Sequence, residues 1–479
     1  MKKLSDLLKG VAVLQRVGQA DVSIDNVQFD SRKVSCNTLF VAQRGTVADG
    51  HQYIGAAIEK GAVVIVAQTL PQELKDSVVY IRVEDSSYSL GLIARNFYDD
   101  PSSQLKLVGI TGTNGKTTTA TLSFNLFSSL GFKCGLISTI VNKIGDKDYP
   151  TERTTPDVLS LNELLSDMVV SGCEFVFMEV SSHAVVQQRI AGLNFSGAVF
   201  SNITHDHLDY HKTFANYIKA KKAFFDMLPK EAFALTNIDD RNGEKMLEDT
   251  KARKYSYSLT KPADFKAKII ENCFEGLLLE INGKEVNTLL VGKFNAYNLL
   301  AIYSIARLCG VSESETLIAL SKLRAADGRF EPHSLKNGAV AIIDYAHTPD
   351  ALDNVISTIN SIRIAGKLIT VVGCGGDRDK TKRPEMAAIA QKGSDILILT
   401  SDNPRSENPE SILEDMKEGI SDTSQVFCIT DRREAIKLAA QLAGSKNDII
   451  LIAGKGHETY QEINGVKHHF DDKEEIMKY

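Results

Sequence analysis

The sequence has no long hydrophobic run, and this absence is informative about the location of the protein in the cell. No stretch of 18 consecutive apolar residues occurs among its 479 residues, so we expect no membrane-spanning helix and no membrane partner. The first residues, MKKLSDLLKGVAVLQ, lack the long apolar core and the small-residue cleavage site of a signal peptide. Together these features predict a cytoplasmic protein.

Cysteine is sparse and follows no pattern. The seven cysteines are scattered along the chain, and none forms a C-x-x-C pair. The chain therefore lacks the paired spacing of a zinc site and the density of a disulfide framework. We expect buried free thiols in a reducing compartment.

Positive charge is not in excess either. Lys and Arg total 55 against 61 Asp and Glu, so the formal net charge is −6. A chain without a global basic field is not expected to bind nucleic acid, and an anionic ligand would need a local site. The content of 43% hydrophobic and 24% charged residues is ordinary for a globular chain.

The order of apolar and amphipathic segments predicts an α/β protein with three domains. At roughly 150 residues per domain, the length allows about three. Residues 1–103 mix short strands and helices, and the polar DDPSSQ at 99–104 is typical of a linker. Residues 104–330 alternate strands with helices, which predicts a parallel sheet covered on both faces. Residues 331–479 alternate again and predict a second, Rossmann-like parallel sheet.

A glycine-rich loop at 112–117 is the strongest functional signal. In KLVGITGTNGKTTTATLSFNLF (106–127) an apolar strand leads into the loop, and a helix follows it. Backbone N–H groups freed by the glycines can surround a phosphate, while Lys116 supplies a charge and Thr117 a hydroxyl for Mg²⁺. The strict P-loop pattern requires glycine at position 110, where this chain has Ile110, so we predict a variant nucleoside triphosphate site.

Acidic and histidine residues follow two further strands of the same predicted sheet. CEFVFMEV (173–180) places Glu179 at the end of a buried strand, within reach of Mg²⁺ beside the loop. An ordinary strand-end carboxylate is the alternative. The next strand ends in SNITHDHLDYH, which packs His205, Asp206, His207, Asp209 and His211 into seven residues and favours work on metal or phosphate over a purely structural role.

Polar clusters also follow each strand of the last block. They are DYAHTPD (344–350), GCGGDRDK (373–380), SDNPR (401–405), TDRREA (430–435) and GKGHE (454–458). Because ligands bind at the carboxyl ends of parallel strands, we expect all five to converge on one cleft. Arg378 and Arg405 fit carboxylates, and Asp402 and Glu458 fit an ammonium, so the cleft predicts an amino-acid ligand. A plain polar turn is the alternative for SDNPR alone, before a helix opening at Pro409.

The motifs together resemble the Mur ligase family over nearly the whole chain. FDSRKV and LFVAQRGTVADGHQYI resemble its uridine-nucleotide domain. TGTNGKTT, TTPD, MEVSSHAVVQQR, NITHDHLDYH, AKKAFF, GKFNAYN and GRFE resemble its ATPase domain, whose loop also lacks the first glycine of the strict pattern. DYAHTPDAL, GCGGDRDKTKRP, DNPR and AGKGHE resemble its amino-acid-binding domain.

The resemblance implies a role for each matching residue. ATP would be held by Gly112, Thr113, Asn114, Gly115, Lys116, Thr117 and Thr118, with Asn295 and Asn298 near the adenine and Arg329 reaching the phosphates. Thr117 and Glu179 would hold one Mg²⁺, and His207 with a carbamylated Lys221 a second. YIKAKKAFF also offers Lys219 and Lys222, and only the A-K-x-x-x-F frame of the family selects Lys221. The UDP-linked substrate would contact Ser31, Thr154, Thr155, Ser181, Gln187 and Arg189. Diaminopimelate would contact Arg378, Asp402, Asn403, Pro404, Arg405, Gly454 and Glu458.

The implied activity is an ATP-dependent ligation by a monomer. It adds meso-diaminopimelate to UDP-N-acetylmuramoyl-L-alanyl-D-glutamate through an acyl phosphate, in the synthesis of peptidoglycan precursors. A lysine-adding relative and a folylpolyglutamate-type ligase are the rival enzymes, and the uridine-like first block and DNPR disfavour the folate enzyme. A non-catalytic P-loop module is the rival of another class, but it would need neither the second metal set nor the second cleft.

Overall fold

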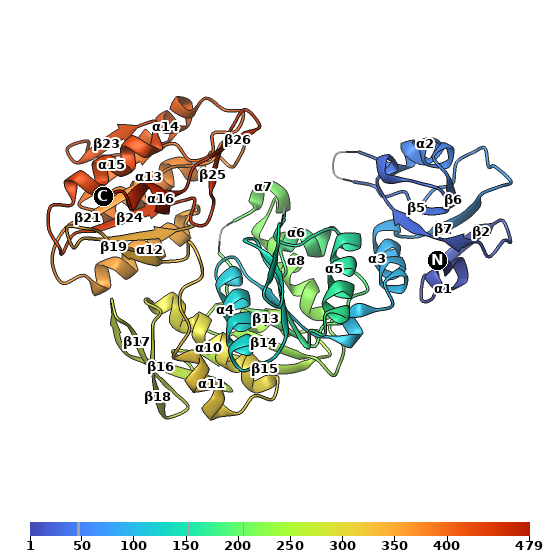
Figure 1. The fold of residues 1–479 in the computed structure, drawn as a ribbon, viewed down its shortest axis with the longest axis horizontal. Helices are drawn as coiled ribbons and strands as arrows, with labels where there is room; N and C mark the ends of the chain where they lie inside the picture. Colours follow the sequence, from blue (N-terminus) through green and yellow to red (C-terminus); the bar gives the residue numbers. More distant parts are fainter. Residues whose placement is uncertain (46–47, 152, 205) are drawn as a thin grey trace.

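The structure is a computed structural model, and it describes residues 1–45, 48–151, 153–204 and 206–479. Figure 1 shows three bodies built on sheets, with the blue N-terminal body at one end, the orange and red C-terminal body at the other and the green and yellow central body between them. No helix in the described part of the chain is long and apolar enough to cross a membrane. The seven cysteines are free thiols, and the expectation of buried thiols is confirmed only for Cys134, Cys173 and Cys374. Cys273 and Cys309 are half-buried, and Cys36 and Cys428 are exposed.

The N-terminal body is a small mixed sheet with helices. The strand order is β2 (Val13–Val17), β7 (Val79–Val83), β6 (Ala62–Ala67), β5 (Thr38–Val41), β4 (Asn26–Gln28), in which β2 is antiparallel and the others are parallel. A separate antiparallel pair joins β1 (Lys2–Lys3) and β3 (Ser23–Ile24). The helices are α1 (Leu4–Leu7), α2 (Ile54–Glu59) and α3 (Ser86–Phe97), with 3-10 turns at Ser31–Lys33, Gly50–Tyr53 and Pro101–Gln104.

The central body has a long sheet whose middle is parallel, as the sequence predicts. Its order is β11 (Lys147–Tyr149), β10 (Asn142–Ile144), β9 (Cys134–Ile137), β12 (Phe175–Glu179), β8 (Lys106–Thr111), β13 (Gly197–Phe200), β14 (Phe233–Asn237), β15 (Arg253–Ser258), β16 (Phe265–Cys273), β17 (Gly276–Ile281), β18 (Lys284–Thr288). The pairs from β9 to β16 are parallel, and antiparallel hairpins extend both edges. The predicted strands are thus present, with added antiparallel edges.

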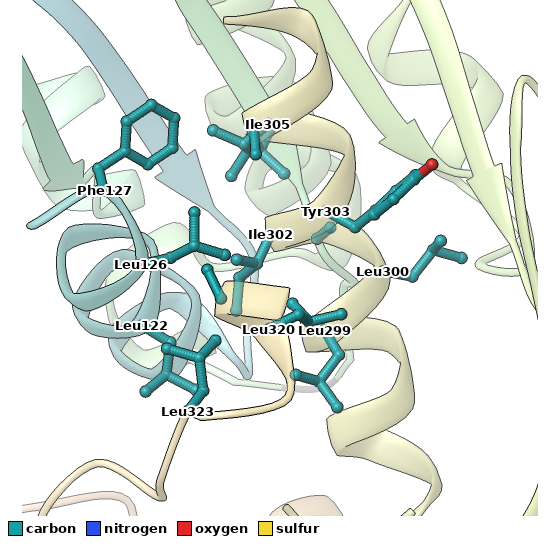
Figure 2. Packing of buried hydrophobic residues seen from close by; sticks show 14 of the residues in the cluster. Leu122, Leu126, Phe127, Leu299, Leu300, Ile302, Tyr303, Ile305, Leu320 and Leu323 are labelled. Atoms are coloured by element: carbon teal, nitrogen blue, oxygen red, sulfur yellow. The ribbon is translucent and has the colours of Figure 1, made fainter. Parts of the chain in front are cut away.

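Helices cover both faces of the central sheet, which explains its continuous apolar strands. They are α4 (Lys116–Ser129), α5 (Val158–Val170), α6 (Ser182–Val186), α7 (Leu208–His211), α8 (Phe214–Asp226), α9 (Gly243–Met246), α10 (Lys293–Leu308) and α11 (Glu313–Leu320). Along β8, Val108 and Ile110 face the core beneath α4 and α10, whereas Leu107 faces the core on the other side. Figure 2 shows Leu126 and Phe127 of α4 near Ile302 and Ile305 of α10, so the helix that begins at the phosphate loop is anchored by this packing.

The C-terminal body is the second sheet predicted from the sequence. Its order is β19 (Glu331–Ser334), β20 (Val340–Asp344), β24 (Ile449–Ala453), β21 (Leu368–Val372), β22 (Ile396–Thr400), β23 (Val426–Ile429), and only the β19 pairing is antiparallel among these described strands. The helices are α12 (Pro349–Ile362), α13 (Lys382–Gly393), α14 (Pro409–Lys417), α15 (Arg432–Leu442) and α16 (Asp472–Ile476). A hairpin of β25 (Tyr460–Ile463) and β26 (Val466–His469) follows β24.

Local sequence fixes where these last helices begin. Asn408 accepts a hydrogen bond from the backbone of Glu410, and Pro409 occupies the first turn of α14, where its missing N–H costs nothing. Thr348 and Pro349 begin α12 in the same way. The predicted helix opening at Pro409 is confirmed.

Candidate active site

A cavity of about 1110 Å³ runs between the carboxyl edges of the central and C-terminal sheets. Its walls come from the phosphate loop, the end of β12, the start of α6, and the loops after β20, β21, β22 and β24. The predicted site residues that line it are Gly112, Thr113, Asn114, Gly115, Lys116, Thr117, Thr154, Thr155, Glu179, Ser181, Arg189, His207, Lys221, Arg329, Arg378, Asp402, Asn403, Arg405, Gly454 and Glu458.

The phosphate loop is shaped by close packing around its glycines. A Cβ at Gly112 would lie 1.9 Å from Ser201 Oγ, and one at Gly115, where φ is +84°, would lie 2.6 Å from Asn298 Oδ1. A side chain at either position would force Ser201 or Asn298 to move, and the left-handed backbone of Gly115 also disfavours other residues, so both positions favour glycine. Asn202 braces the loop further by accepting hydrogen bonds from the backbone N–H groups of Thr113 and Asn114, over 2.8 and 2.9 Å.

Lys116 is folded back on the loop from which it projects. Its Nζ donates to the carbonyls of Gly112, over 3.0 Å, and Thr113, over 2.8 Å. Burial lowers the pKa of Lys116, although nearby Glu179 and Asp206 oppose the shift. A charge held in this partly desolvated place would interact more strongly with a bound phosphate than it would in water.

Glu179 ends β12 and is fully buried beside the loop. It accepts hydrogen bonds from Thr117 Oγ1 over 3.0 Å and from the Thr139 backbone N–H over 2.8 Å. Arg329 donates to the same Thr117 Oγ1 over 3.1 Å. The hydroxyl and carboxylate oxygens gathered here are the ligands that Mg²⁺ prefers, so Thr117 and Glu179 fit the predicted magnesium site.

Lys221 reaches the loop from the other side, out of α8. It is fully buried, and its Nζ donates to the carbonyl of Gly112 over 2.8 Å. Burial and the nearby charge of Lys116 lower the pKa of Lys221 well below its ordinary value. Of the two neighbouring lysines in YIKAKKAFF, Lys219 is exposed and Lys222 pairs with Asp226 over 2.9 Å, so Lys221 alone among the three approaches the phosphate loop.

The histidine cluster after β13 lies partly at the cavity. Asp206 and His207 line it, and burial lowers the pKa of His207 to about 4 despite the neighbouring Asp206 carboxylate. His211 instead packs inside, with Nε2 2.9 Å from Ser182 Oγ. His205 and the side chain of Asp209 lie outside the described residues. Among the described residues no group of three or more His, Cys, Asp and Glu side chains is arranged to hold a metal ion, so the metal role of this cluster stays a prediction.

A connected set of polar side chains forms the wall on the α6 side. Thr155 Oγ1 donates to the Glu179 carbonyl over 2.8 Å, and Arg189 Nη1 donates to the Thr155 carbonyl over 2.8 Å. Gln187 does not line the cavity, but its Oε1 accepts from Arg189 Nη2 over 2.6 Å and so holds that guanidinium. Ser181 caps α6 by accepting from Ala184.

Several predicted nucleotide and substrate residues lie away from the cavity. Asn295 and Asn298 of α10 are buried and do not line the cavity. Asn298 Nδ2 donates to Asn295 Oδ1 over 3.0 Å. Thr118 is likewise buried in α4, and Ser31 lies in the N-terminal body. Their roles toward adenine, ATP or the UDP-linked substrate stay predictions.

The amino-acid pocket forms the far end of the cavity. Arg405 has a left-handed backbone, with φ +51°, which is held by hydrogen bonds to the Glu462 carbonyl and from the Asn464 N–H. Its Nη1 donates to the Gly376 carbonyl over 2.6 Å. Asn403 Nδ2 donates to Glu458 Oε2 over 2.7 Å, so the turn after β22 and the loop after β24 are joined.

The expectation that all five strand-end clusters meet in one cleft is wrong for TDRREA. Arg432 and Arg433 line a separate groove of about 530 Å³, together with Pro404, which therefore also lies outside the main cavity. The reason is the strand order, because β23 is the edge strand beyond β22. Arg432 is fully buried and pairs instead with Asp472 over 2.7 Å.

Residues that were not assigned from the sequence also join the two sheets. Asp350, at the start of α12, accepts from Asn114 Nδ2 over 2.6 Å and from Thr204 Oγ1 over 3.2 Å. Tyr345 lies under the Arg329 guanidinium at 4.6 Å. Both belong to the strand-end motif DYAHTPD, so the motif gave a signal, but only the fold shows which of its residues touch the phosphate loop.

A phosphate loop on one parallel sheet, facing a pocket of arginines and carboxylates on a second, defines an ATP-dependent ligase that joins an acid to an amino acid. Family models agree with this class. The Mur ligase middle domain matches residues 110–306, the Mur ligase glutamate ligase domain matches 328–456, and the Mur ligase family catalytic domain matches 23–98. The chain belongs to the Mur ligase family.

Known relatives are similar over the full length. The UDP-N-acetylmuramoyl-L-alanyl-D-glutamate–2,6-diaminopimelate ligase of Phocaeicola vulgatus is 54% identical over 98% of both chains. That of Clostridioides difficile is 41% identical over 98% of both. A solved structure of a ligase with this title is 35% identical and has a TM-score of 0.70 over 96% of both chains. A folylpolyglutamate synthase from Thermotoga maritima, 17% identical with a TM-score of 0.59 over 77% of this chain and 90% of its own, shares the fold alone.

Proposed function

We propose that this protein adds meso-diaminopimelate to the D-glutamate of UDP-N-acetylmuramoyl-L-alanyl-D-glutamate, with conversion of ATP to ADP and phosphate. The observation that carries the proposal is the single cavity that holds Lys116 and Glu179 at one end and Arg405 and Glu458 at the other. The relatives named for this reaction, 54% identical over 98% of the chain, support it. A cytoplasmic, monomeric enzyme without a nucleic-acid or membrane partner stays a prediction.

The reaction needs an activated carboxylate. The D-glutamyl carboxylate oxygen attacks the γ-phosphate of ATP, the bond to the β-phosphate oxygen breaks, and an acyl phosphate forms. The amine of the incoming amino acid then attacks the acyl carbon, loses a proton, and expels inorganic phosphate. Lys116 and Arg329 would offset the charge that spreads over the transferring phosphoryl group.

Two magnesium sites are part of the proposal. Thr117 and Glu179 supply oxygen ligands for one ion, and His207 with Lys221 would serve the second. When bound, Mg²⁺ offsets charge on the phosphate oxygens. An ammonium cannot ligate a cation, but the buried amine of Lys221, whose pKa is lowered, fits reaction with CO₂ to give an anionic carbamate. Carbamylated in this way, Lys221 would offer oxygen ligands to the second ion.

The pocket favours diaminopimelate over lysine. The two amino acids share one zwitterionic end, and only diaminopimelate adds a carboxylate at the other. Arg405 can receive that carboxylate through a two-bond fork, whereas lysine would leave the guanidinium facing an apolar carbon. A site built to hydrogen-bond a group rejects an analogue lacking it by about 10⁴-fold or more.

A phosphate-release assay with an amino-acid panel tests the proposal. ATP and UDP-N-acetylmuramoyl-L-alanyl-D-glutamate are supplied with meso-diaminopimelate, L-lysine or L-glutamate. We expect release that requires both the UDP-linked substrate and meso-diaminopimelate. Release with lysine at equal efficiency would assign a lysine-adding enzyme, and ATP binding without release would favour a non-catalytic module. In a parallel reaction a folate replaces the UDP-linked substrate, and release there with L-glutamate would assign a folylpolyglutamate-type enzyme.

A further inference from the structure

Lys455 is a fully buried lysine next to the amino-acid pocket, and the reaction described for the ligase does not use it. Lys455 follows Gly454 at the end of β24, and its side chain has no solvent exposure. Its Nζ donates to Asn403 Oδ1 over 3.2 Å, to Glu458 Oε2 over 3.3 Å and to the carbonyl of Tyr460. The three N–H donors of the ammonium therefore have three acceptors.

These contacts fix the orientation of the Asn403 amide. Its Oδ1 accepts from Lys455 and also from the backbone N–H of Glu462, over 2.9 Å. Its Nδ2 is then the end that donates to Glu458 Oε2, over 2.7 Å. If the Asn403 amide were flipped, its NH₂ group would face the Lys455 ammonium and the Glu462 N–H, which are both donors. Lys455 and Glu462 therefore determine that Asn403 donates to Glu458.

The same contacts bear on the charge of Glu458. Burial and the Asp402 carboxylate raise the pKa of Glu458, while Lys455 and Asn403 oppose that shift. Three further groups interact electrostatically with Glu458. Glu458 and Asp402 help to raise the pKa of the buried Arg432. Burial raises the pKa values of Tyr345 and Tyr460, and Glu458 adds to both shifts. Lys455 is the only one of these groups that touches Glu458 as a cation.

We propose that Lys455 is a positioning residue of the amino-acid site, which holds Asn403 and Glu458 in the arrangement that receives the ammonium group of the incoming amino acid. Lys455 does not line the cavity, so it acts through these two residues rather than by touching the amino acid. The proposal rests on the proposed ligase function. Removing the lysine leaves Glu458 buried beside Asp402 without its cation, which disfavours the ionised form that pairs with an ammonium.

The test compares Lys455→Met with a matched control in steady-state phosphate release. Lys467→Met is the control, because Lys467 also lies over the Tyr460 ring, at 4.1 Å, but is exposed and makes no contact with Asn403 or Glu458 that the structure records. We expect Lys455→Met to raise the KM for meso-diaminopimelate about tenfold or more, the scale of coupling in a buried polar network, with the KM for ATP within twofold. The control should match the parent.

The pH profile of kcat/KM for meso-diaminopimelate supplies a readout that general destabilisation would not move. This profile reports groups of the free enzyme, and it should fall as Glu458 gains a proton at low pH. In Lys455→Met the fall should move to higher pH by about one unit, as expected when an opposite charge at hydrogen-bonding distance is lost. An unmoved profile together with a parent KM overturns the proposal.

A double variant keeps the proposal testable if Lys455→Met alone fails to fold. In Lys455→Met/Glu458→Gln no buried carboxylate is left without its cation, and such paired replacements are better tolerated. If Lys455 acts through Glu458, Lys455→Met should raise the KM for meso-diaminopimelate by a smaller factor in the Glu458→Gln background than in the parent. We expect the two factors to differ at least about threefold. Equal costs in both backgrounds overturn the proposal. A parent with no amino-acid-dependent phosphate release refutes the ligase function itself, which separates the two failures.

Discussion

Arg329 donates a hydrogen bond from Nη2 to Thr117 Oγ1 over 3.1 Å, so an arginine from the segment just before β19 touches the phosphate loop. Thr117 in turn donates to Glu179. A guanidinium, a hydroxyl and a carboxylate therefore lie in series beside Lys116. This series joins the central sheet to the first strand of the C-terminal body at the place where phosphate charge would be held.

Replacing Lys116 by alanine should abolish ligation. Lys116 is the loop cation, and a preorganised charge contact to the transferring phosphoryl group contributes about 3 kcal/mol or more to transition-state stabilisation. Phosphate release with saturating substrates measures the loss. Lys106→Ala, at the opposite end of β8, is the matched control and should keep parent activity. Ligation by Lys116→Ala within tenfold of the parent would contradict the phosphate-loop assignment.

Replacing Lys221 by alanine should inactivate the enzyme in a way that a small carboxylate can repair. If the side chain acts as a carbamate, acetate or propionate added to Lys221→Ala can supply the missing anionic oxygens. Activity is measured with and without these additives, and Lys219→Ala, on the exposed side of the same helix, is the control. A fully active Lys221→Ala without any additive would refute the role.

Replacing Arg405 should change which amino acid is used. Arg405→Ala should raise the KM for meso-diaminopimelate greatly and narrow its preference over lysine, because the fork for the second carboxylate is lost. Arg405→Lys should not restore it, since a point charge cannot make two parallel hydrogen bonds. The KM for ATP should stay unchanged in both. A parent enzyme that uses lysine as efficiently as meso-diaminopimelate would overturn this interpretation of the turn.

Asp344 should make stability depend on pH. Burial raises the pKa of its carboxyl to about 6, although Arg329 and the Phe330 N–H, 2.7 Å from Oδ2, oppose the shift. The folded protein therefore binds this proton more tightly than the unfolded chain. The resulting stability is fully present below the unfolded pKa of about 4 and is lost as pH rises through about 6, a change of about 1–3 kcal/mol.

Asp344→Asn tests this dependence, because the amide stays neutral and its oxygen can still accept from Phe330. We expect the variant to unfold at a higher temperature than the parent at pH 7.5 and at nearly the same temperature at pH 4.5. Thermal unfolding followed by circular dichroism at the two pH values measures the difference. A variant that is less stable than the parent at pH 7.5 would show that the charged carboxylate stabilises the fold.

The sequence was sufficient for most of the elements and for most of the residues that line the cavity. Apolar strands and amphipathic helices in alternation predict two parallel sheets, and both are present, because strand and helix periodicity is a local property. The glycine-lysine-threonine loop, Glu179 and the DNPR turn could be found for the same reason, since each motif carries its chemistry in consecutive residues. The antiparallel hairpins at the edges of the central sheet were not predicted, because pairing direction depends on partners elsewhere in the chain.

Tertiary structure decided which of these residues meet. Only the strand order removes TDRREA and Pro404 from the main cavity. The family frame already selects Lys221, but only the fold shows that Lys221 is buried while Lys219 is exposed. From the sequence, Lys455 could be recognised only as part of the GKGHE motif. Its contact with Asn403, 52 residues earlier in the chain, is known only from the fold. The physical reason is that burial and hydrogen-bond partners arise from contacts between distant segments, whereas a motif specifies only its own neighbours.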